Sequence, residues 1–357
     1  MPTPRARAPR TPYLRVDLAR MRRNLTYAAD LARTAGVALR PHVKTHKCVE
    51  IARLQLAAGA TGLSVATIGE AETFVRHGVD DVFVAYPLWL DDTSAGRLVD
   101  LTGDARIAIG VDSVEGAANA GRLLGGAAVE VLVEVDSGHH RSGVLPREAV
   151  AVASAASRTG LDIRGVFTFP GHSYAPGALA RAAEDEAVAL RAARDALAAA
   201  GLEPRVVSGG STPSLAHSDT DVLTELRPGV YVFGDAQQWE LGSMPADAIA
   251  LSCRATVVSH AGGRLVIDSG SKVLGADRPA WATGSGRLLD HPDARVVLLS
   301  EHHAVVDLGD DALPPLGSQV DVVPNHVCNA VNLVDTLHAE ESGELRPWPV
   351  AARGLNA

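Results

Sequence analysis

One structural unit recurs along the first part of the chain, and this repetition limits the folds that the chain can adopt. Each copy has a short apolar segment, a polar turn and an amphipathic helical pattern. Unbroken apolar strands that alternate with helices are typical of a parallel sheet covered on both faces. Eight such strands, separated by seven helical patterns, predict an α/β fold of the (β/α)8 TIM-barrel type. The expected strands cover residues 37–43, 63–66, 82–86, 106–111, 129–136, 162–169, 205–208 and 224–233.

An open, doubly wound sheet is the alternative to a barrel, but no G-x-G-x-x-G sequence follows the first strand. A short strand and a helix are expected before the barrel, from residue 14 onward. Beyond residue 241 the helical pattern stops, and the expected strands at 250–258, 264–268, 295–299 and 320–323 are separated by Gly, Pro and Asp turns. We therefore expect two domains: residues 1–241 as the barrel with its N-terminal strand and helix, and residues 242–357 as a mostly β domain.

Composition narrows the possible partners and location. The net charge of −9 provides no broad basic surface for nucleic acid, and no apolar run is long enough to span a membrane. The N-terminus, with Arg5, Arg7 and Arg10, lacks the apolar region of a signal peptide. The three cysteines are too widely separated to indicate a disulfide framework, which favours a reducing, cytoplasmic location.

The run R-P-H-V-K-T-H-K, which contains Lys44, lies between the first expected barrel strand and the first expected barrel helix. Parallel α/β folds assemble their active sites at such carboxyl ends of strands. A neutral lysine amine can form a Schiff base with an aldehyde cofactor, so Lys44 is a candidate for this role. A basic loop on a solvated surface is the alternative interpretation. Further segments that fit the same site favour the functional one.

Two of these segments follow the fifth and sixth expected strands. In D-S-G-H-H-R-S-G, the guanidinium of Arg141 can donate to a phenolate oxygen or a carboxylate. In F-P-G-H-S-Y, either His172 or Tyr174 can exchange a proton with a substrate. The alternatives are a structural Asp–Arg pair, a buried tyrosine and a hydrogen-bonded histidine.

The segment S-G-G-S-T-P-S closes the seventh expected strand. Consecutive amides and hydroxyls at Gly210, Ser211 and Thr212 suit an anion, and barrels often bind phosphate after this strand. No G-K-[ST] sequence is present, so the segment is not a nucleotide-binding P-loop. A plain Gly/Ser turn is the alternative.

His326 and Cys328, in the expected β domain, are separated by one residue. In an extended chain this spacing would put both side chains on one face, because a strand has a period of two. An imidazole and a thiolate suit Zn²⁺ and leave positions open for water or substrate. Packing without a metal is the alternative, because buried histidine and cysteine are common.

These segments together resemble the family of D-threonine aldolase and eukaryotic-type D-serine dehydratase. Its members are pyridoxal 5'-phosphate (PLP) enzymes with an alanine-racemase-like barrel, also called fold type III. The resemblance extends from residue 11 to about residue 337. It implies that Lys44 binds PLP, that Arg141 approaches the cofactor ring oxygen, that the Gly210–Thr212 segment holds the phosphate, and that Tyr231 contacts the cofactor. It also implies a homodimer that acts on a small D-amino acid.

The resemblance further implies that His326 and Cys328 bind Zn²⁺ or another divalent metal such as Mn²⁺. The H-x-C form is that of the dehydratases, as is the order G-H-S-Y, whereas residues 330–333 look more like the aldolases. The preferred hypothesis is therefore a lyase that dehydrates D-serine to pyruvate and ammonia. A D-threonine aldolase, which would release glycine and an aldehyde, is the alternative. An amino-acid racemase, which would need no metal, is a further one.

Overall fold

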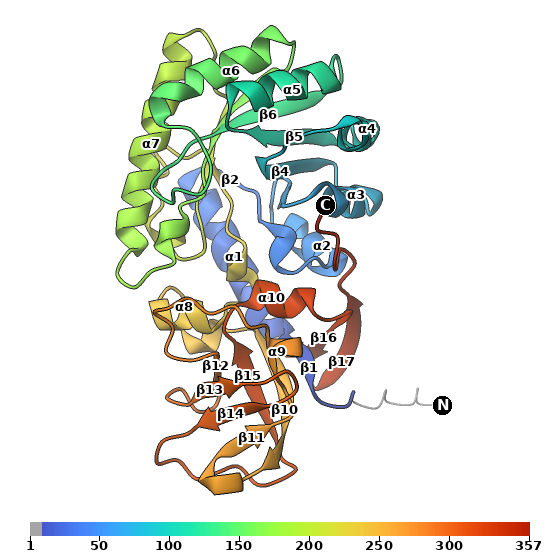
Figure 1. Cartoon of the computed structure of the whole chain (residues 1–357), viewed down its shortest axis with the longest axis vertical. Coiled ribbons are helices and arrows are strands. Elements are labelled where there is room, and N and C mark those ends of the chain that lie inside the picture. Colours follow the sequence, from blue (N-terminus) through green and yellow to red (C-terminus); the bar gives the residue numbers. More distant parts are fainter. Residues whose placement is uncertain (1–8) are drawn as a thin grey trace. The chain divides into compact units, whose positions relative to one another are not determined.

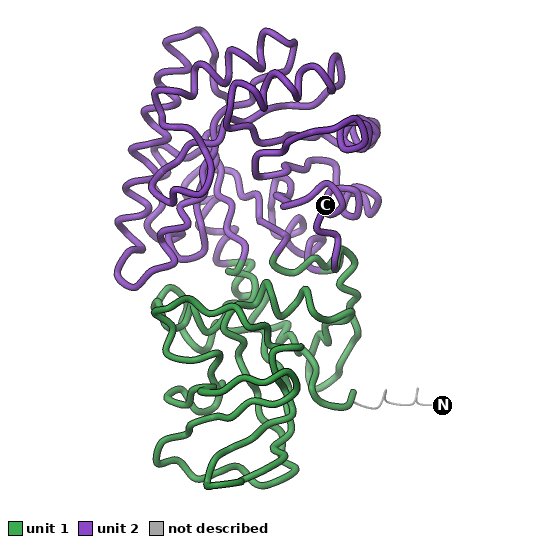
Figure 2. Tube along the Cα trace, viewed as in Figure 1, with its two compact units in different colours: residues 1–26, 45–50, 230–353 green, residues 27–44, 51–229, 354–357 purple. Residues whose placement is uncertain are grey.

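The computed structural model describes residues 9–357, so the N-terminal segment with Arg5 and Arg7 lies outside the described residues. The chain forms two compact units (Figure 2). Residues 27–44, 51–229 and 354–357 form the barrel unit, and the described residues 9–26, 45–50 and 230–353 form the β unit. The helix α1 (Leu18–Ala35) begins in the β unit and ends in the barrel unit.

The barrel unit contains eight parallel strands in the order β2-β9-β8-β7-β6-β5-β4-β3. A parallel bridge between His42 and Ser64, with a 2.9 Å hydrogen bond from Ser64 N to Pro41 O, joins the two edges of the sheet. The predicted fold class is therefore confirmed. The strands are β2 (Ala38–Leu39), β3 (Leu63–Val65), β4 (Asp81–Pro87), β5 (Arg106–Val111), β6 (Val129–Glu134), β7 (Asp162–Phe167), β8 (Val206–Gly209) and β9 (Glu225–Leu226).

Helices cover the outer side of this sheet (Figure 1). All six residues of β6 are buried, because this strand is covered on both of its faces. On the inner side, the rings of Phe83 and Phe167 meet edge to face with their centroids 5.0 Å apart. The helices are α2 (Val49–Ala57), α3 (Ile68–Arg76), α4 (Asp92–Leu101), α5 (Val114–Leu124), α6 (Ala149–Arg158) and α7 (Leu179–Ala199).

The first and last expected barrel strands are much shorter than predicted. Of residues 37–43 and 224–233, only two residues of each form regular strand, as β2 and β9. Pro41 and Pro228 interrupt both runs, because proline has no amide hydrogen for a ladder. The expected helix after residue 212 is a single 3₁₀ turn, Leu215–His217.

The β unit is built on a nine-stranded sheet with three short helices. The strand β1 lies within this sheet, antiparallel to β10 and parallel to β16. Its strands are β1 (Tyr13–Asp17), β10 (Leu251–Ser259), β11 (Leu265–Ile267), β12 (Gly286–Leu288), β13 (Arg295–Leu299), β14 (Ala304–Asp307), β15 (Gln319–Pro324), β16 (Thr336–Glu341) and β17 (Glu344–Pro349). Its helices are α8 (Ala236–Leu241), α9 (Ser271–Leu274) and α10 (Val327–Asn332).

This division differs from the expected one at residue 241. The sequence position of the N-terminal strand predicts that it belongs to the barrel, but its backbone pairs with two strands from the C-terminal part of the chain. The chain passes into the β unit at residue 230. Strand pairing between residues more than 200 positions apart leaves no local signal, so the periodicity of the sequence could not locate β1.

Candidate active site

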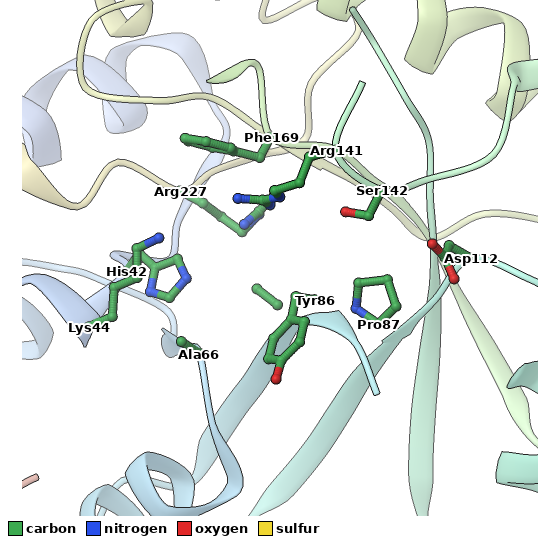
Figure 3. A pocket seen from close by; sticks show the side chains of 11 residues that line it. His42, Lys44, Ala66, Tyr86, Pro87, Asp112, Arg141, Ser142, Phe169 and Arg227 are labelled. Atoms are coloured by element: carbon green, nitrogen blue, oxygen red, sulfur yellow. The ribbon is translucent and has the colours of Figure 1, made fainter. Parts of the chain in front are cut away.

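A pocket of about 450 Å³ lies at the carboxyl ends of the barrel strands (Figure 3). Residues from seven of the eight strands or the loops that follow them contribute side chains to it, as barrel active sites do. The lining residues are His42, Lys44, Ala66, Ala85, Tyr86, Pro87, Asp112, Arg141, Ser142, Phe169 and Arg227.

Lys44 lies in the 3₁₀ turn Val43–Thr45, between β2 and α2, as expected. The chain has only three lysines, and Lys44 is the one that lines the pocket. Lys47 donates to the backbone oxygen of Ala352 in the β unit, and Lys272 forms an exposed ion pair with Glu301. Of the three amines, that of Lys44 is therefore the candidate for a bond to an aldehyde.

Arg141 lines the same pocket, beside two residues that the sequence did not single out. Its guanidinium carbon lies 5.3 Å from the centroid of the Phe169 ring, a cation–π arrangement. Its Nη2 lies 4.0 Å from Oε1 of Glu134, which is 4% exposed. Burial raises the pKa of Glu134, although a hydrogen bond from Ser142 and the charge of Arg141 oppose that rise.

Arg227 is a buried cation that also lines this pocket, and sequence reasoning missed it. Its Nε donates to Ser208 Oγ at 2.7 Å, and its Nη2 donates to the Thr168 backbone oxygen. Burial lowers the pKa of Arg227, against the charges of nearby glutamates. Three cationic side chains thus line the pocket against one carboxylate, that of Asp112. The pocket is suited to an anionic ligand.

The other missed lining residues, among them His42, Tyr86 and Asp112, share one signal. Each lies at or just beyond the carboxyl end of an expected barrel strand. Listing the residues at those ends would have found them without any knowledge of the structure.

His172 and Tyr174 lie in and beside the 3₁₀ turn Gly171–Ser173, but neither lines the pocket. The ring of Tyr174 packs against Phe169 with a centroid distance of 6.1 Å. His172 Nε2 lies 3.4 Å from Oδ2 of Asp185 on α7. Tyr174 therefore adjoins the pocket through Phe169, whereas His172 is engaged by the outer helix.

The Gly210–Thr212 segment does not contribute to the lining of this pocket. Gly210 has φ +86, which glycine adopts at little cost, and its amide donates to Glu186 Oε1 at 2.7 Å. Ser211 is buried and hydrogen-bonds to Ser173 and Ser214, both at 2.8 Å. The Gly210 amide is thus occupied by a carboxyl group, so an anion here would rely on the other donors of the loop.

Tyr231 lies in a 3₁₀ turn, Val230–Val232, and not at the end of a strand. It belongs to the β unit and is 3% exposed. Its predicted contact with a cofactor stays a prediction.

His326 and Cys328 lie in the β unit, and the predicted extended conformation is confirmed for the backbone of His326 but wrong for Cys328, which is helical. His326 is the N-cap residue of α10, and Cys328 lies in the first turn of this helix. The two side chains nevertheless hydrogen-bond to each other, because a cap residue and the first turn lie side by side. Cys328 Sγ also donates to Thr45 Oγ1 at 3.4 Å.

The buried carboxylate of Asp235 holds the imidazole of His326. Its Oδ2 lies 3.1 Å from His326 Nδ1, which leaves Nε2 as the nitrogen for a cation. Burial acts to lower the pKa of His326, but Cys328 and Asp235 outweigh it, and the pKa is raised well above its usual value. Within residues 9–357 no group of three or more His, Cys, Asp or Glu side chains is set to hold a metal. One nitrogen and one sulfur fit a soft divalent ion that takes its other ligands from water or substrate.

A closed parallel barrel with a lysine in the pocket at its carboxyl ends, joined to a β unit, defines the class of alanine-racemase-like enzymes. The chain belongs to this family: residues 16–237 match the alanine racemase N-terminal domain, and residues 250–339 match a putative serine dehydratase domain. Membership of this family implies PLP as the cofactor. The chain is therefore a PLP-dependent lyase.

Relatives of known activity match nearly the whole chain. The D-threo-3-hydroxyaspartate dehydratase of Delftia sp. HT23 is 36% identical over 89% of this chain and 90% of its own length. Its solved structure superposes with a TM-score of 0.89 and covers 96% of this chain and 97% of that one. The D-threonine aldolase of an Arthrobacter species is 32% identical over 97% of this chain and 93% of its own length. Solved variants of the dehydratase include a cysteine-to-alanine mutant in the metal-free form and a histidine-to-alanine mutant.

No helix among the described residues is long and apolar enough to cross a membrane.

Proposed function

We propose that this protein is a PLP- and divalent-metal-dependent dehydratase of D-β-hydroxy-α-amino acids, and that it converts D-serine to pyruvate and ammonia. The observation that carries the proposal is the interacting pair His326 and Cys328, backed by Asp235, in a chain whose only pocket lysine is Lys44. The pair suits a metal that activates a hydroxyl as a leaving group, and the lysine suits PLP.

Lys44 is proposed to hold PLP, which when bound withdraws electrons from the α-carbon of an amino acid. Once its amine is released by the substrate, Lys44 Nζ can take the α-proton. Arg141 is proposed to donate to the anionic oxygen of the cofactor ring or, with two parallel N–H groups, to a substrate carboxylate. Ser211 and Thr212 are proposed to bind the phosphate with Gly210 shaping their loop, and Tyr231 to contact the cofactor.

His326 Nε2 and Cys328 Sγ are proposed as ligands of Zn²⁺ or another divalent ion such as Mn²⁺, which would act as a Lewis acid on a β-hydroxyl. The two substituted positions in the solved dehydratase variants are a histidine and a cysteine two residues apart, the spacing of His326 and Cys328. Tyr174, beside Phe169, is proposed as a second proton carrier, with His172 as the other candidate.

A second substrate, D-threo-3-hydroxyaspartate, is favoured by a specific observation. The Delftia dehydratase that is named for this substrate aligns with this chain over 90% of its own length. Beside Lys44, the pocket has two guanidinium groups, Arg141 and Arg227, against the one carboxylate of Asp112, and such an excess suits a substrate with a second carboxylate. The aldolase reaction remains the alternative chemistry, since the Arthrobacter enzyme matches a similar share of the chain.

One set of assays tests these alternatives. The PLP-loaded protein is incubated with D-serine, D-threo-3-hydroxyaspartate, D-threonine and their L-forms, with and without a chelator, and the products are identified. Ammonia and a keto acid from the D-forms only, lost with the chelator, is the expected result. Release of glycine and an aldehyde would show that the reaction is aldol cleavage and not dehydration. Interconversion of D- and L-forms that resists the chelator would indicate a racemase. Lys44→Ala serves as the inactive control.

The family resemblance also supports a homodimer and a cytoplasmic location as parts of this proposal. All three cysteines are free thiols, in keeping with a reducing compartment. Sedimentation analysis of the purified protein tests the dimer.

A further inference from the structure

We propose that Asp235 is a positioning residue for the proposed metal ligands His326 and Cys328, and that it holds His326 with Nε2 directed to the ion. This inference rests on the proposed function, because it assumes that His326 and Cys328 bind a metal. Asp235 is 0% exposed and lies 91 positions before His326 in the sequence. No sequence motif singles it out.

The two oxygens of this carboxylate have separate tasks. Oδ1 accepts from the backbone amide of Gln238 at 2.9 Å and so caps α8 as its N-cap residue. Oδ2 accepts from the Val327 amide at 3.1 Å, at the start of α10, and lies 3.1 Å from His326 Nδ1. The one buried side chain of Asp235 therefore bonds to the first turn of α8, to the first turn of α10 and to the imidazole of His326.

This arrangement determines which imidazole nitrogen can bind a cation. A carboxylate can only accept, so Nδ1 must carry a hydrogen when it bonds to Oδ2. The lone pair is then on Nε2, which is the nitrogen left for a metal. The hydrogen bond from the Val327 amide fixes the position of Oδ2, so the ring orientation is set by the backbone of α10. His326 itself makes no side-chain capping bond to this helix.

The neighbouring backbone reinforces the same geometry. The Gln237 amide donates to the backbone oxygen of Asn325 at 3.2 Å, which ties the start of α8 to the residue before His326. Asn325 Nδ2 in turn donates to the backbone oxygen of Asp277 at 2.7 Å. The proposed ligands His326 and Cys328 thus lie at the start of a short helix that is held from two sides. A preformed metal site needs such a rigid support.

Two substitutions separate metal positioning from helix capping. Asp235→Asn has the same shape but keeps a single acceptor oxygen and no negative charge, so it cannot accept from the Gln238 amide and from His326 Nδ1–H together. Asp235→Ser keeps a good N-cap residue for α8, but its single short oxygen cannot also serve His326. Asp91→Asn is the matched control, because Asp91 caps α4 through Ser94 N at 2.7 Å in the barrel unit.

The test measures Zn²⁺ dissociation constants of the PLP-loaded proteins by competition with a chromophoric chelator, together with the Co²⁺ absorption spectrum. We expect both Asp235 variants to bind Zn²⁺ about 10- to 100-fold more weakly and to shift the Co²⁺ bands, and Asp91→Asn to match the wild type. If Asp235→Asn fails to fold, Asp235→Ser decides. Wild-type affinity and an unchanged spectrum in a folded Asp235 variant would overturn the inference.

His326→Ala and Cys328→Ala distinguish that failure from failure of the proposed function. If these two variants lose Zn²⁺ binding while the Asp235 variants keep it, only the positioning role is wrong. If all variants bind Zn²⁺ as the wild type does, the metal is bound elsewhere, and both proposals are overturned.

Discussion

The Nζ atom of Lys44 lies 5.7 Å from the centroid of the Phe169 ring, and the guanidinium of Arg141 lies over the same ring. The ring face attracts both cations while it keeps them on the lining of one pocket. Phe169 follows β7, whereas Lys44 and Arg141 follow β2 and β6, so three loops meet at this ring. The arrangement places an amine and a guanidinium together where one anionic ligand can contact both.

Lys44→Ala should abolish the yellow absorbance of the PLP-loaded protein. Among the three lysines only Lys44 lines the pocket, so no other amine is placed to replace it. The absorption spectrum after dialysis against PLP is the measurement. Lys272→Ala, which removes an exposed amine paired with Glu301, is the control and should stay yellow. Retained colour in Lys44→Ala would remove the assignment.

Cys328→Ser should lose most of its metal and its dehydratase activity while remaining folded. A hydroxyl is a much weaker ligand than a thiolate for a soft divalent ion. Cys328 is partly exposed and donates to Thr45 Oγ1 at 3.4 Å, and serine can donate to the same oxygen, so the exchange should leave the fold in place. Metal content by atomic emission, with the activity, checks this. Cys253→Ser is the matched control for metal content, because its thiol is buried in the β sheet.

Glu186→Gln should remove a pH dependence of stability. Burial raises the pKa of Glu186 to about 7 from 4.5, so between these values the folded protein keeps a proton that the unfolded chain releases. The stability of the wild type therefore falls as the pH rises through this window, by about 3 kcal/mol in total. Glutamine keeps an oxygen acceptor for the Gly210 amide and does not titrate. The free energy of unfolding of the variant should therefore rise relative to that of the wild type between pH 5 and pH 8.

Urea unfolding of both proteins at pH 5 and pH 8 measures this difference. Glu184→Gln, an exposed position on the same helix, should show a pH dependence like that of the wild type. A constant difference between Glu186→Gln and the wild type at the two pH values would contradict the prediction.

Arg40→Ala should destabilise the barrel by roughly 3–5 kcal/mol, because it leaves a buried carboxylate without its partner. Arg40 is 1% exposed, and its Nε donates to Glu225 at 2.7 Å while its Nη1 donates to Asp81 at 2.8 Å. The free energy of unfolding is the measurement. Arg33→Ala, at an exposed ion pair with Asp30, should change it by less than about 1 kcal/mol. Equal effects of the two substitutions on the free energy of unfolding would contradict the prediction that the buried ion pairs of Arg40 stabilise the barrel.

Local patterns were enough for much of the fold and part of the site. The strand expected at residues 106–111 is β5 to the residue, because an apolar run buried on both faces needs no other information. Lys44 and Arg141 were placed correctly at carboxyl ends of barrel strands, since the order of strand, turn and helix is local. The short strands β2 and β9 were overestimated, because apolar runs continue through Pro41 and Pro228 while the ladder does not.

The barrel, the lysine at its carboxyl ends and the His-x-Cys pair can be recognised from the amino-acid sequence alone, because they depend on residue types at short spacings. Three other features follow only from the folded chain: β1 belongs to the β unit, Arg227 lines the pocket, and Asp235 lies beside His326. These relationships join residues distant in the chain, and their partners are selected by burial and by the need to satisfy buried polar groups, which only the folded chain can define.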